Sequence, residues 1–156
     1  MSPGTLDHAG IEALIPHRGP MCLLDRMTSW DGTRIECVAV NHRDAGHPLR
    51  SASGLLASAA IEYAAQAMAL HGALSAAAAG DRAAPGFLAS ARDVRLACRR
   101  LDDLPSADRD ELVVVAERQA ADAARLLYAF VLRHDGREIA SGRVAVVLNA
   151  ASANGR

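Results

Sequence analysis

This 156-residue sequence contains few cysteines and few aromatic residues, and neither sign of charge is in clear excess. The three cysteines lie far apart and form no C-x-x-C pair, so the sequence predicts neither a disulfide framework nor a zinc site. We expect Cys22, Cys37 and Cys98 to be packed as free thiols. The formal net charge of −1 argues against a nucleic-acid or anionic-membrane binder, because such proteins usually carry a strong basic excess.

Long apolar runs are also missing. No run approaches the ~20 residues of a membrane span, and the first residues lack a positively charged segment followed by an apolar stretch. We therefore expect a cytoplasmic protein that does not contact membranes. The length suits a single domain over residues 1–148, which needs no metal to fold, with a frayed tail over residues 149–156.

The sequence does contain strand patterns on either side of one long helix pattern. Residues 53–79 lack proline, begin with Ser53, precede Gly80 and are dominated by Ala, Leu and Met, so they are predicted to form a helix. Because this segment is apolar on nearly every face, other structure should cover most of its sides. A short helix is predicted over residues 6–15, and strands are predicted over residues 21–28, 34–40, 88–98, 111–117, 126–133 and 139–148.

The connections between strands favour an antiparallel sheet. Asp31-Gly32 and Asp135-Gly136 supply residues that tolerate the positive φ angles of tight hairpin turns. The strand over residues 88–98 alternates apolar and charged side chains, so it is expected to be half-buried. Since no repeated β-α-β alternation is present, the order of elements predicts an α+β fold.

Three segments in the first half of the chain resemble one enzyme family. PHRGPMCLLDR (residues 16–26) is similar to the PHR-x-P-x-LL-x-DR opening of the bacterial β-hydroxyacyl-ACP dehydratases. GHP (residues 46–48) resembles their Gly-His-Phe-Pro segment, and residues 62–67 match the E-x-x-A-Q-A pattern of their central helix. IEYAAQAMALHGAL, FLASARDVRL and LDDLP further resemble a divergent subgroup found in aryl polyene and related pigment clusters.

The resemblance implies a hotdog fold, in which a curved antiparallel sheet of five or six strands wraps around the helix over residues 53–79. It also implies a homodimer in which His47 of one subunit faces Glu62 of the other, with a heterodimer with another hotdog subunit as the alternative. The implied substrate is a 3-hydroxyacyl group on the phosphopantetheine of acyl carrier protein. The implied reaction is dehydration to the trans-2-enoyl thioester in fatty-acid or polyene-pigment biosynthesis, with no further cofactor.

Dehydration needs a base at the α-carbon, an acid at the 3-hydroxyl and a donor that polarises the thioester carbonyl. His47 suits the base, since an ordinary imidazole with a pKa near 6.5 is largely neutral at cytoplasmic pH. Glu62 suits the acid, because burial among apolar neighbours raises the pKa of a carboxyl. Gln66 lies one helical turn further on and is expected to orient Glu62.

Backbone N–H groups at the predicted start of the long helix are candidates for the carbonyl-polarising donors, and they belong to Gly54, Leu55 and Leu56. A cluster of arginines is a candidate contact for the acidic carrier protein, and it consists of Arg92, Arg95, Arg99 and Arg100. His17 is expected to be structural, and His42 and His71 are assigned no role.

Two other functions fit the same residues. Glu62 can activate water in a thioesterase, because hotdog thioesterases also use a carboxylate on the central helix. The chain can also be a catalytically inert hotdog partner of an active dehydratase, since residues 49–56 lack the Met-Pro-Gly turn that follows the catalytic histidine in the family.

Overall fold

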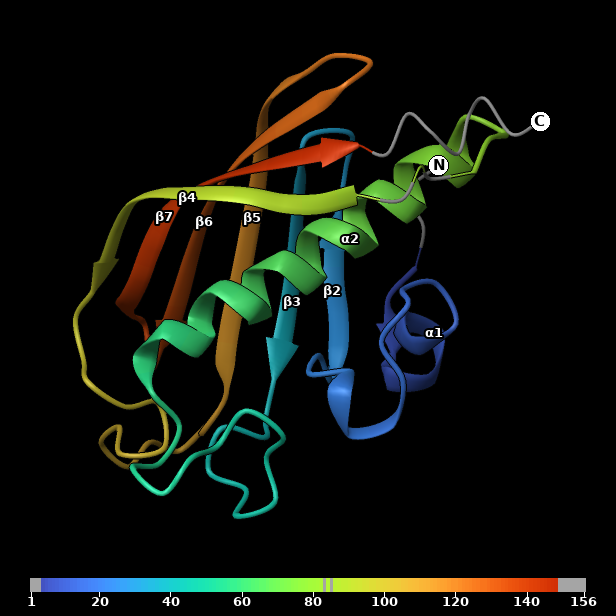
Figure 1. The fold of residues 1–156 in the computed structure, drawn as a ribbon. Helices are drawn as coiled ribbons and strands as arrows, with labels where there is room; N and C mark the ends of the chain where they lie inside the picture. The colour runs from blue at the N-terminus through green and yellow to red at the C-terminus, as the bar shows by residue number, and fades with distance from the viewer. Residues whose placement is uncertain (1–3, 83, 85, 149–156) are drawn as a thin grey trace.

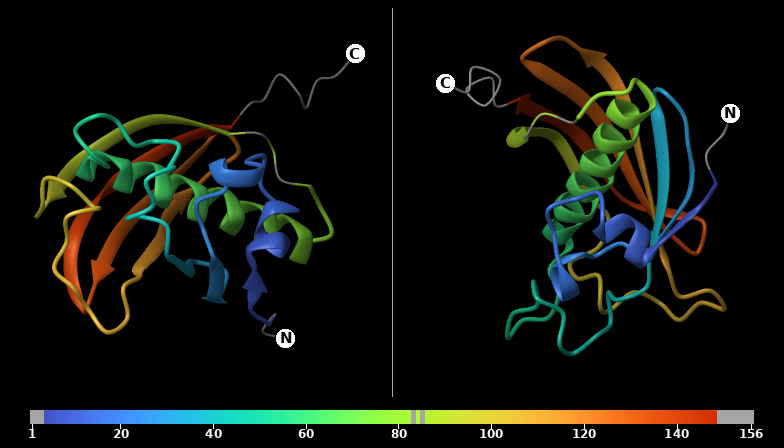
Figure 2. Two further views of the ribbon diagram at one scale, coloured as in Figure 1. Left: turned by 90° about the horizontal axis from the view of Figure 1, so that it is seen from below. Right: turned by 90° about the vertical axis from the view of Figure 1, so that its right-hand side faces the viewer.

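A long helix lies across the concave face of a curved, seven-stranded antiparallel sheet (Figures 1 and 2). The computed structural model describes residues 4–82, 84 and 86–148. Its elements in chain order are β1 (Leu6–Asp7), α1 (His8–Glu12), η1 (Gly19–Met21), β2 (Arg26–Trp30), β3 (Arg34–Ala39), η2 (Ala57–Ala59), α2 (Ala60–Ala78), β4 (Gly86–Leu96), β5 (Leu112–Ala121), β6 (Arg125–His134) and β7 (Arg137–Leu148). This arrangement confirms the predicted α+β hotdog fold.

The strand order in the sheet is β1-β2-β3-β5-β6-β7-β4. The sheet has one strand more than expected, because Leu6 and Asp7 pair with Met27 and Arg26 before the first helix begins. The Asp7 side chain accepts a hydrogen bond of 2.8 Å from the backbone N–H of Gly10 and so caps α1. The predicted first helix is therefore shorter than residues 6–15.

Both predicted hairpin turns are present, for different reasons. Asp135 and Gly136 adopt positive φ angles between β6 and β7, as predicted. Gly32 does not, and the turn between β2 and β3 depends instead on the Asp31 carboxylate, which accepts hydrogen bonds from the N–H groups of Thr33 and Arg34.

The long helix begins later than predicted. Gly54 has a φ of +95° and pairs with Ser51 in a tight turn, so the chain is not helical there. The 3-10 turn η2 follows, and α-helical geometry starts only at Ala60. The predicted end is confirmed, since Gly80 follows the helix with a φ of +72°.

One side of α2 packs on the sheet. Its small alanine side chains let the helix approach the strands closely, and its larger side chains fill the space between them. The buried residues of the helix are Ala60, Tyr63, Ala64, Gln66, Ala67, Met68, Leu70 and His71. We expected other structure to cover most sides of the helix, but within the described residues only the side that faces the sheet is covered. Cys22 and Cys37 are buried free thiols, as expected, and Cys98 is only partly buried.

The predicted half-burial of the strand over residues 88–98 is wrong. The strand, β4, forms one edge of the sheet and pairs only with β7. Its side chains are largely exposed, with 61% of Phe87, 44% of Leu88 and 42% of Leu96 accessible. Alternation indicated a strand here, but it did not show that most of the strand's side chains stay exposed in the described part of the chain.

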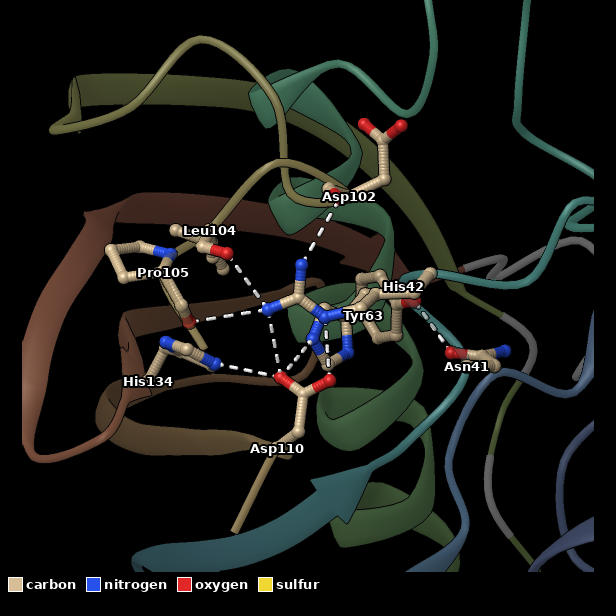
Figure 3. Close-up of polar contacts among 9 residues, drawn as sticks. Asn41, His42, Tyr63, Asp102, Leu104, Pro105, Asp110 and His134 are labelled. Carbon is tan, nitrogen blue, oxygen red and sulfur yellow. Dashed lines mark hydrogen bonds and ion pairs between the residues drawn. The ribbon is translucent and has the colours of Figure 1, made fainter. Parts of the chain in front are cut away.

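A charged cluster joins the loop after β3 to the end of β6 (Figure 3). The Arg43 guanidinium donates from Nε and Nη2 to the Asp110 carboxylate at 2.5 and 3.0 Å. The Nε2 atoms of His42 and His134 lie 3.0 and 2.9 Å from the same carboxylate. Arg43 also donates to the backbone carbonyls of Asp102 and Leu104, so one side chain ties the β3–α2 loop to several points of the β4–β5 loop.

These contacts also fix protonation states. The hydrogen bond from Arg43 is the largest of the effects that hold the pKa of Asp110 far below its ordinary value of 3.8. Burial lowers the pKa of His42, which favours its neutral form.

Among the described residues no helix is long and apolar enough to cross a membrane.

Two glycine substitutions should change stability in opposite directions. A Cβ atom on Gly142 would lie 2.9 Å from Phe130, so Gly142→Ala should lower the free energy of unfolding by about 1–3 kcal/mol through overpacking. Gly72 lies inside α2 with nothing within 4 Å of its added Cβ, so Gly72→Ala should raise it by up to about 1 kcal/mol. Denaturant titration of both variants tests this, and a stable Gly142→Ala protein would contradict the tight contact.

Asp110→Ala should lower the free energy of unfolding by about 2 kcal/mol at pH 7, because Arg43 and two buried imidazoles lose their acceptor. The pKa of Asp110 is depressed in the folded state, so its contribution is present above the ordinary pKa of 3.8 and is lost as the pH falls below it. The difference from the wild type should therefore narrow in acid. Denaturant titrations at pH 7 and pH 3 measure this, with the exposed Asp108→Ala variant as the control. Equal stability of the Asp110→Ala and wild-type proteins would contradict the cluster's role.

Candidate functional site

His47 lies in the loop between β3 and α2, where successive tight turns hold it in place. Its backbone N–H donates to the carbonyl of Asp44 at 3.1 Å, and its carbonyl accepts from the N–H of Arg50 at 3.0 Å. Only 5% of the residue is exposed. The histidine singled out from the sequence is therefore buried and fixed, not a free surface residue.

Both ring nitrogens of His47 have partners. Nε2 lies 2.9 Å from the hydroxyl of Tyr63, which donates to Oδ1 of Asn41 at 2.6 Å. Nδ1 accepts a hydrogen bond of 3.1 Å from the backbone N–H of Leu49. Sequence reasoning missed Tyr63 and Asn41, although a tyrosine directly after Glu62 in an apolar helix was a visible signal.

Burial lowers the pKa of His47 below its ordinary 6.5. The carboxylate of Asp44 opposes this effect, whereas His42 and Arg50 add to it. The imidazole is therefore neutral at pH 7, which is the state a general base requires.

Glu62 lies in the first turn of α2 and points to a different region. Its Oε1 accepts a hydrogen bond of 3.1 Å from Gln66 and lies 3.3 Å from Nε2 of His17. Gln66 is itself fixed, since it donates to the carbonyl of Met21 and accepts from the N–H of Leu23, both at 2.8 Å. The predicted contact between Gln66 and Glu62 is present. His17, expected to be structural, also contacts the carboxylate.

The expected burial of Glu62 is not seen in this chain, because 37% of its side chain is exposed. The reason is geometric: successive helical residues point roughly 100° apart, so Glu62 turns away from the core that holds Tyr63. The carboxylate is therefore accessible to water or to a partner molecule.

His47 and Glu62 line different cavities of the chain. His47 borders a pocket of about 290 Å³ together with Asn41 and Asp44. Glu62 borders a larger groove of about 620 Å³ between α2 and the strands β4, β6 and β7. The groove has polar groups near Glu62 and His17, and apolar walls that include Met68, Ala69, Leu88, Leu126 and Val146.

The structure corrects two of the three predicted carbonyl-polarising donors, those of Gly54 and Leu55. The segment from Gly54 to Leu56 precedes the helix and does not form its N-terminus. The N–H of Gly54 donates to Ser51 at 3.0 Å, and that of Leu55 donates to the carboxylate of Asp102 at 3.0 Å. These two groups are already engaged. The hydrogen bonds of the bridge between Leu56 and Arg100 come from the N–H groups of Ala57 and Leu101, so the N–H of Leu56 stays a predicted donor.

The four arginines of the predicted carrier-protein contact differ in their surroundings. Arg92 and Arg95 lie exposed on β4, and Arg99 is exposed just beyond it. Arg100 differs, because its guanidinium lies 3.2 Å from Asp102. Since 41% of the Arg100 side chain is exposed, a carrier-protein contact remains a prediction for all four arginines.

Among the described residues, one group of three side chains has the spacing of metal ligands. Atoms of His42, Asp110 and His134 lie within 4.8 Å of one another. However, the Arg43 guanidinium already binds both oxygens of Asp110, and its positive charge opposes a cation at the same point. The cluster is therefore a structural ion pair with two imidazole donors.

Comparison with known proteins identifies the family of this chain. A model of the ApeP-like family, described as ApeP dehydratase, matches residues 9–154. A search of curated protein sequences gave no match.

Several solved structures share the fold. The dehydratase heterocomplex ApeI:P from Xenorhabdus doucetiae superimposes with a TM-score of 0.76 at 20% identity, over 89% of this chain and 90% of that one. A putative thioesterase from Silicibacter gives 0.60 at 12% identity, over 92% of each chain. A hypothetical thioesterase with coenzyme A from Streptococcus pneumoniae gives 0.55 at 8% identity, over 79% of this chain and 84% of that one.

Likeness at these identities shows the fold alone, whereas the family model spans nearly the whole sequence. The chain therefore belongs to the ApeP-like dehydratase family.

Proposed function

We propose that the protein dehydrates a 3-hydroxyacyl thioester, carried on the phosphopantetheine of acyl carrier protein, to the trans-2-enoyl thioester. The observation that carries the proposal is a buried, neutral His47 together with a Glu62 carboxyl at the polar end of an apolar groove of about 620 Å³. An apolar groove suits an acyl chain, and the two side chains supply the base and acid that elimination needs.

The active site is proposed to be shared between two subunits. His47 and Glu62 of one chain border different cavities, so a single chain does not bring them to one substrate. The exposed apolar side chains of β4 offer a surface for a second hotdog subunit, which is either another copy or a related chain. The similar structure from Xenorhabdus doucetiae is a heterocomplex, which supports the second possibility.

In the proposed reaction, His47 of one subunit removes a proton from the α-carbon. The electrons of that C–H bond form the α,β double bond as the 3-hydroxyl departs. Glu62 of the other subunit protonates the departing oxygen, which leaves as water. Gln66 and His17 hold the Glu62 carboxyl in place.

The carrier protein is proposed to approach along β4 and the loop after it. Arg92, Arg95 and Arg99 are exposed there and offer positive charge to an acidic partner. The acyl product then serves fatty-acid or polyene-pigment biosynthesis.

Thioester hydrolysis is the second candidate function. The exposure of Glu62 favours it, because a carboxylate in contact with water can activate that water for attack on the thioester carbonyl. The thioesterases among the similar structures share the fold and so are consistent with it.

Substitution at the two proposed catalytic positions should abolish most dehydratase activity. His47→Ala and Glu62→Gln should each lower kcat/KM by about 10²–10⁴-fold, since each removes a general acid or base. The assay is hydration of enoyl thioesters on carrier protein, by the protein alone and with a companion hotdog subunit. Glu138→Gln, at an exposed position on β7, is the matched control and should keep full activity.

Different results identify the alternatives. Release of free thiol that depends on Glu62 and not on His47 assigns the thioesterase function. Full activity of the His47→Ala variant in a complex with a companion assigns a structural role to this chain's histidine.

Charge placed on β4 should separate the subunits. Phe87→Glu and Leu96→Glu introduce carboxylates on an edge where apolar side chains are exposed, so they should convert a dimer to a monomer in light scattering at micromolar concentration. Stability of the single chain should change little, because these side chains are largely exposed. Leu127→Glu, at an exposed position on β6, is the control. A wild-type monomer, alone and with a companion subunit, would contradict the shared site.

A further inference from the structure

We propose that Tyr63 and Asn41 are positioning residues for His47, which hold its imidazole in the Nε2–H tautomer and make Nδ1 the basic nitrogen. The tautomer follows from the structure alone, and its consequence for turnover rests on the proposed function. Neither residue reacts with substrate; both act through the histidine.

The first step of the argument concerns Nδ1. The backbone N–H of Leu49 lies 3.1 Å from this atom and can only donate. In a neutral imidazole, one nitrogen carries the proton and the other accepts. Nδ1 is therefore the acceptor, and the proton resides on Nε2.

The second step concerns Nε2, which lies 2.9 Å from the Tyr63 hydroxyl. The hydroxyl proton is directed to Oδ1 of Asn41, 2.6 Å away, so the Tyr63 oxygen is left to accept from Nε2–H. The hydrogen bonds then run in one consistent direction from His47 through Tyr63 to Asn41. Two independent contacts, at the two ring nitrogens, thus select the same tautomer.

Burial strengthens this selection. Tyr63 has no exposed surface, so water cannot replace the hydroxyl at Nε2. Burial also raises the pKa of Tyr63, so the phenol stays neutral and keeps the proton that it donates to Asn41.

The tautomer decides where a substrate proton is held. A proton taken by His47 binds to Nδ1, where it meets the N–H of Leu49, and two donors then face each other. The N–H of Leu49 must therefore move away before Nδ1 can take the α-proton, and its return favours the neutral histidine once that proton has left.

The position of Tyr63 in α2 adds a second consequence. Glu62 and Tyr63 are consecutive, yet one faces the apolar groove and the other contacts His47. In the proposed dimer, Glu62 of a helix serves one active site while Tyr63 of the same helix positions the histidine of the other.

Nitrogen NMR of protein labelled in its histidine rings tests the tautomer directly. Above the pKa of His47, wild-type protein should show an unprotonated Nδ1 and a protonated Nε2, with signals assigned by their loss in His47→Asn. Tyr63→Phe should move both ring nitrogens towards a mixture of tautomers. Asn41→Leu should do the same, because Tyr63 can then turn its proton towards Nε2, whereas Asn41→Asp retains an acceptor and should retain the tautomer.

The same variants should show a split between kcat and KM. Tyr63→Phe should lower kcat about 10- to 100-fold, the range found for outer partners of metal-bound histidines, with KM within about twofold. For stability and ring signals, Tyr128→Phe is the matched control, because the Tyr128 hydroxyl lies 2.8 Å from Nδ1 of His71 in an equally buried pair. It should lower stability to a similar extent and leave the His47 ring signals unchanged.

A wild-type protein with the proton on Nδ1 of His47 would overturn the inference. So would ring signals in Tyr63→Phe that move no further than those in Tyr128→Phe. If Tyr63→Phe does not fold, the ring-nitrogen signals of the wild-type and Asn41→Leu proteins still test the inference. If the tautomer changes as expected but no form of the protein acts on enoyl thioesters, the positioning role holds and the proposed function fails.

Discussion

Close contact between α2 and the concave face of the sheet determines the geometry of the whole candidate site. Alanines at the contact let the helix sit close to the strands, and the hydroxyl of the buried Tyr63 thereby comes within reach of the β3–α2 loop. The same contact leaves Glu62 on the open side of the helix, at the apolar groove. The packing of this one helix thus places Tyr63 in the core and Glu62 at the groove.

The loop that carries His47 has little regular structure and is held by polar contacts instead. Arg43 and Asp110 fasten its beginning to the end of β6, and Asp102 fastens its later part through the N–H of Leu55 and the side chain of Arg50. Gly54 makes the second attachment possible, since any Cβ there would lie 2.8 Å from Asp102. The altered loop sequence therefore does not leave His47 loosely held, because other side chains fix its position.

The edge strand β4 connects fold and function. The core lies between α2 and the inner side of the sheet, whereas Phe87 and Leu88 on β4 remain exposed, and Leu88 lines the groove that Glu62 borders. An unpaired apolar edge is unfavourable for a monomer. A second subunit at this edge would cover it and, in the proposed arrangement, complete the site.

The sequence by itself determined the elements and their class. Helix propensity and Gly80 marked α2 and its end, alternation and turn residues marked the hairpins, and three motifs pointed to His47, Glu62 and Gln66. These are local properties, read from residues close together in the chain. Only the tertiary structure decided that α2 starts at Ala60 and that β4 is an exposed edge. It also decided that Tyr63 and His17 contact the proposed catalytic side chains and that Asn41 accepts from Tyr63. Each depends on atoms brought together from distant parts of the chain, such as the Asp102 carboxylate at Leu55, and no local pattern records those distances.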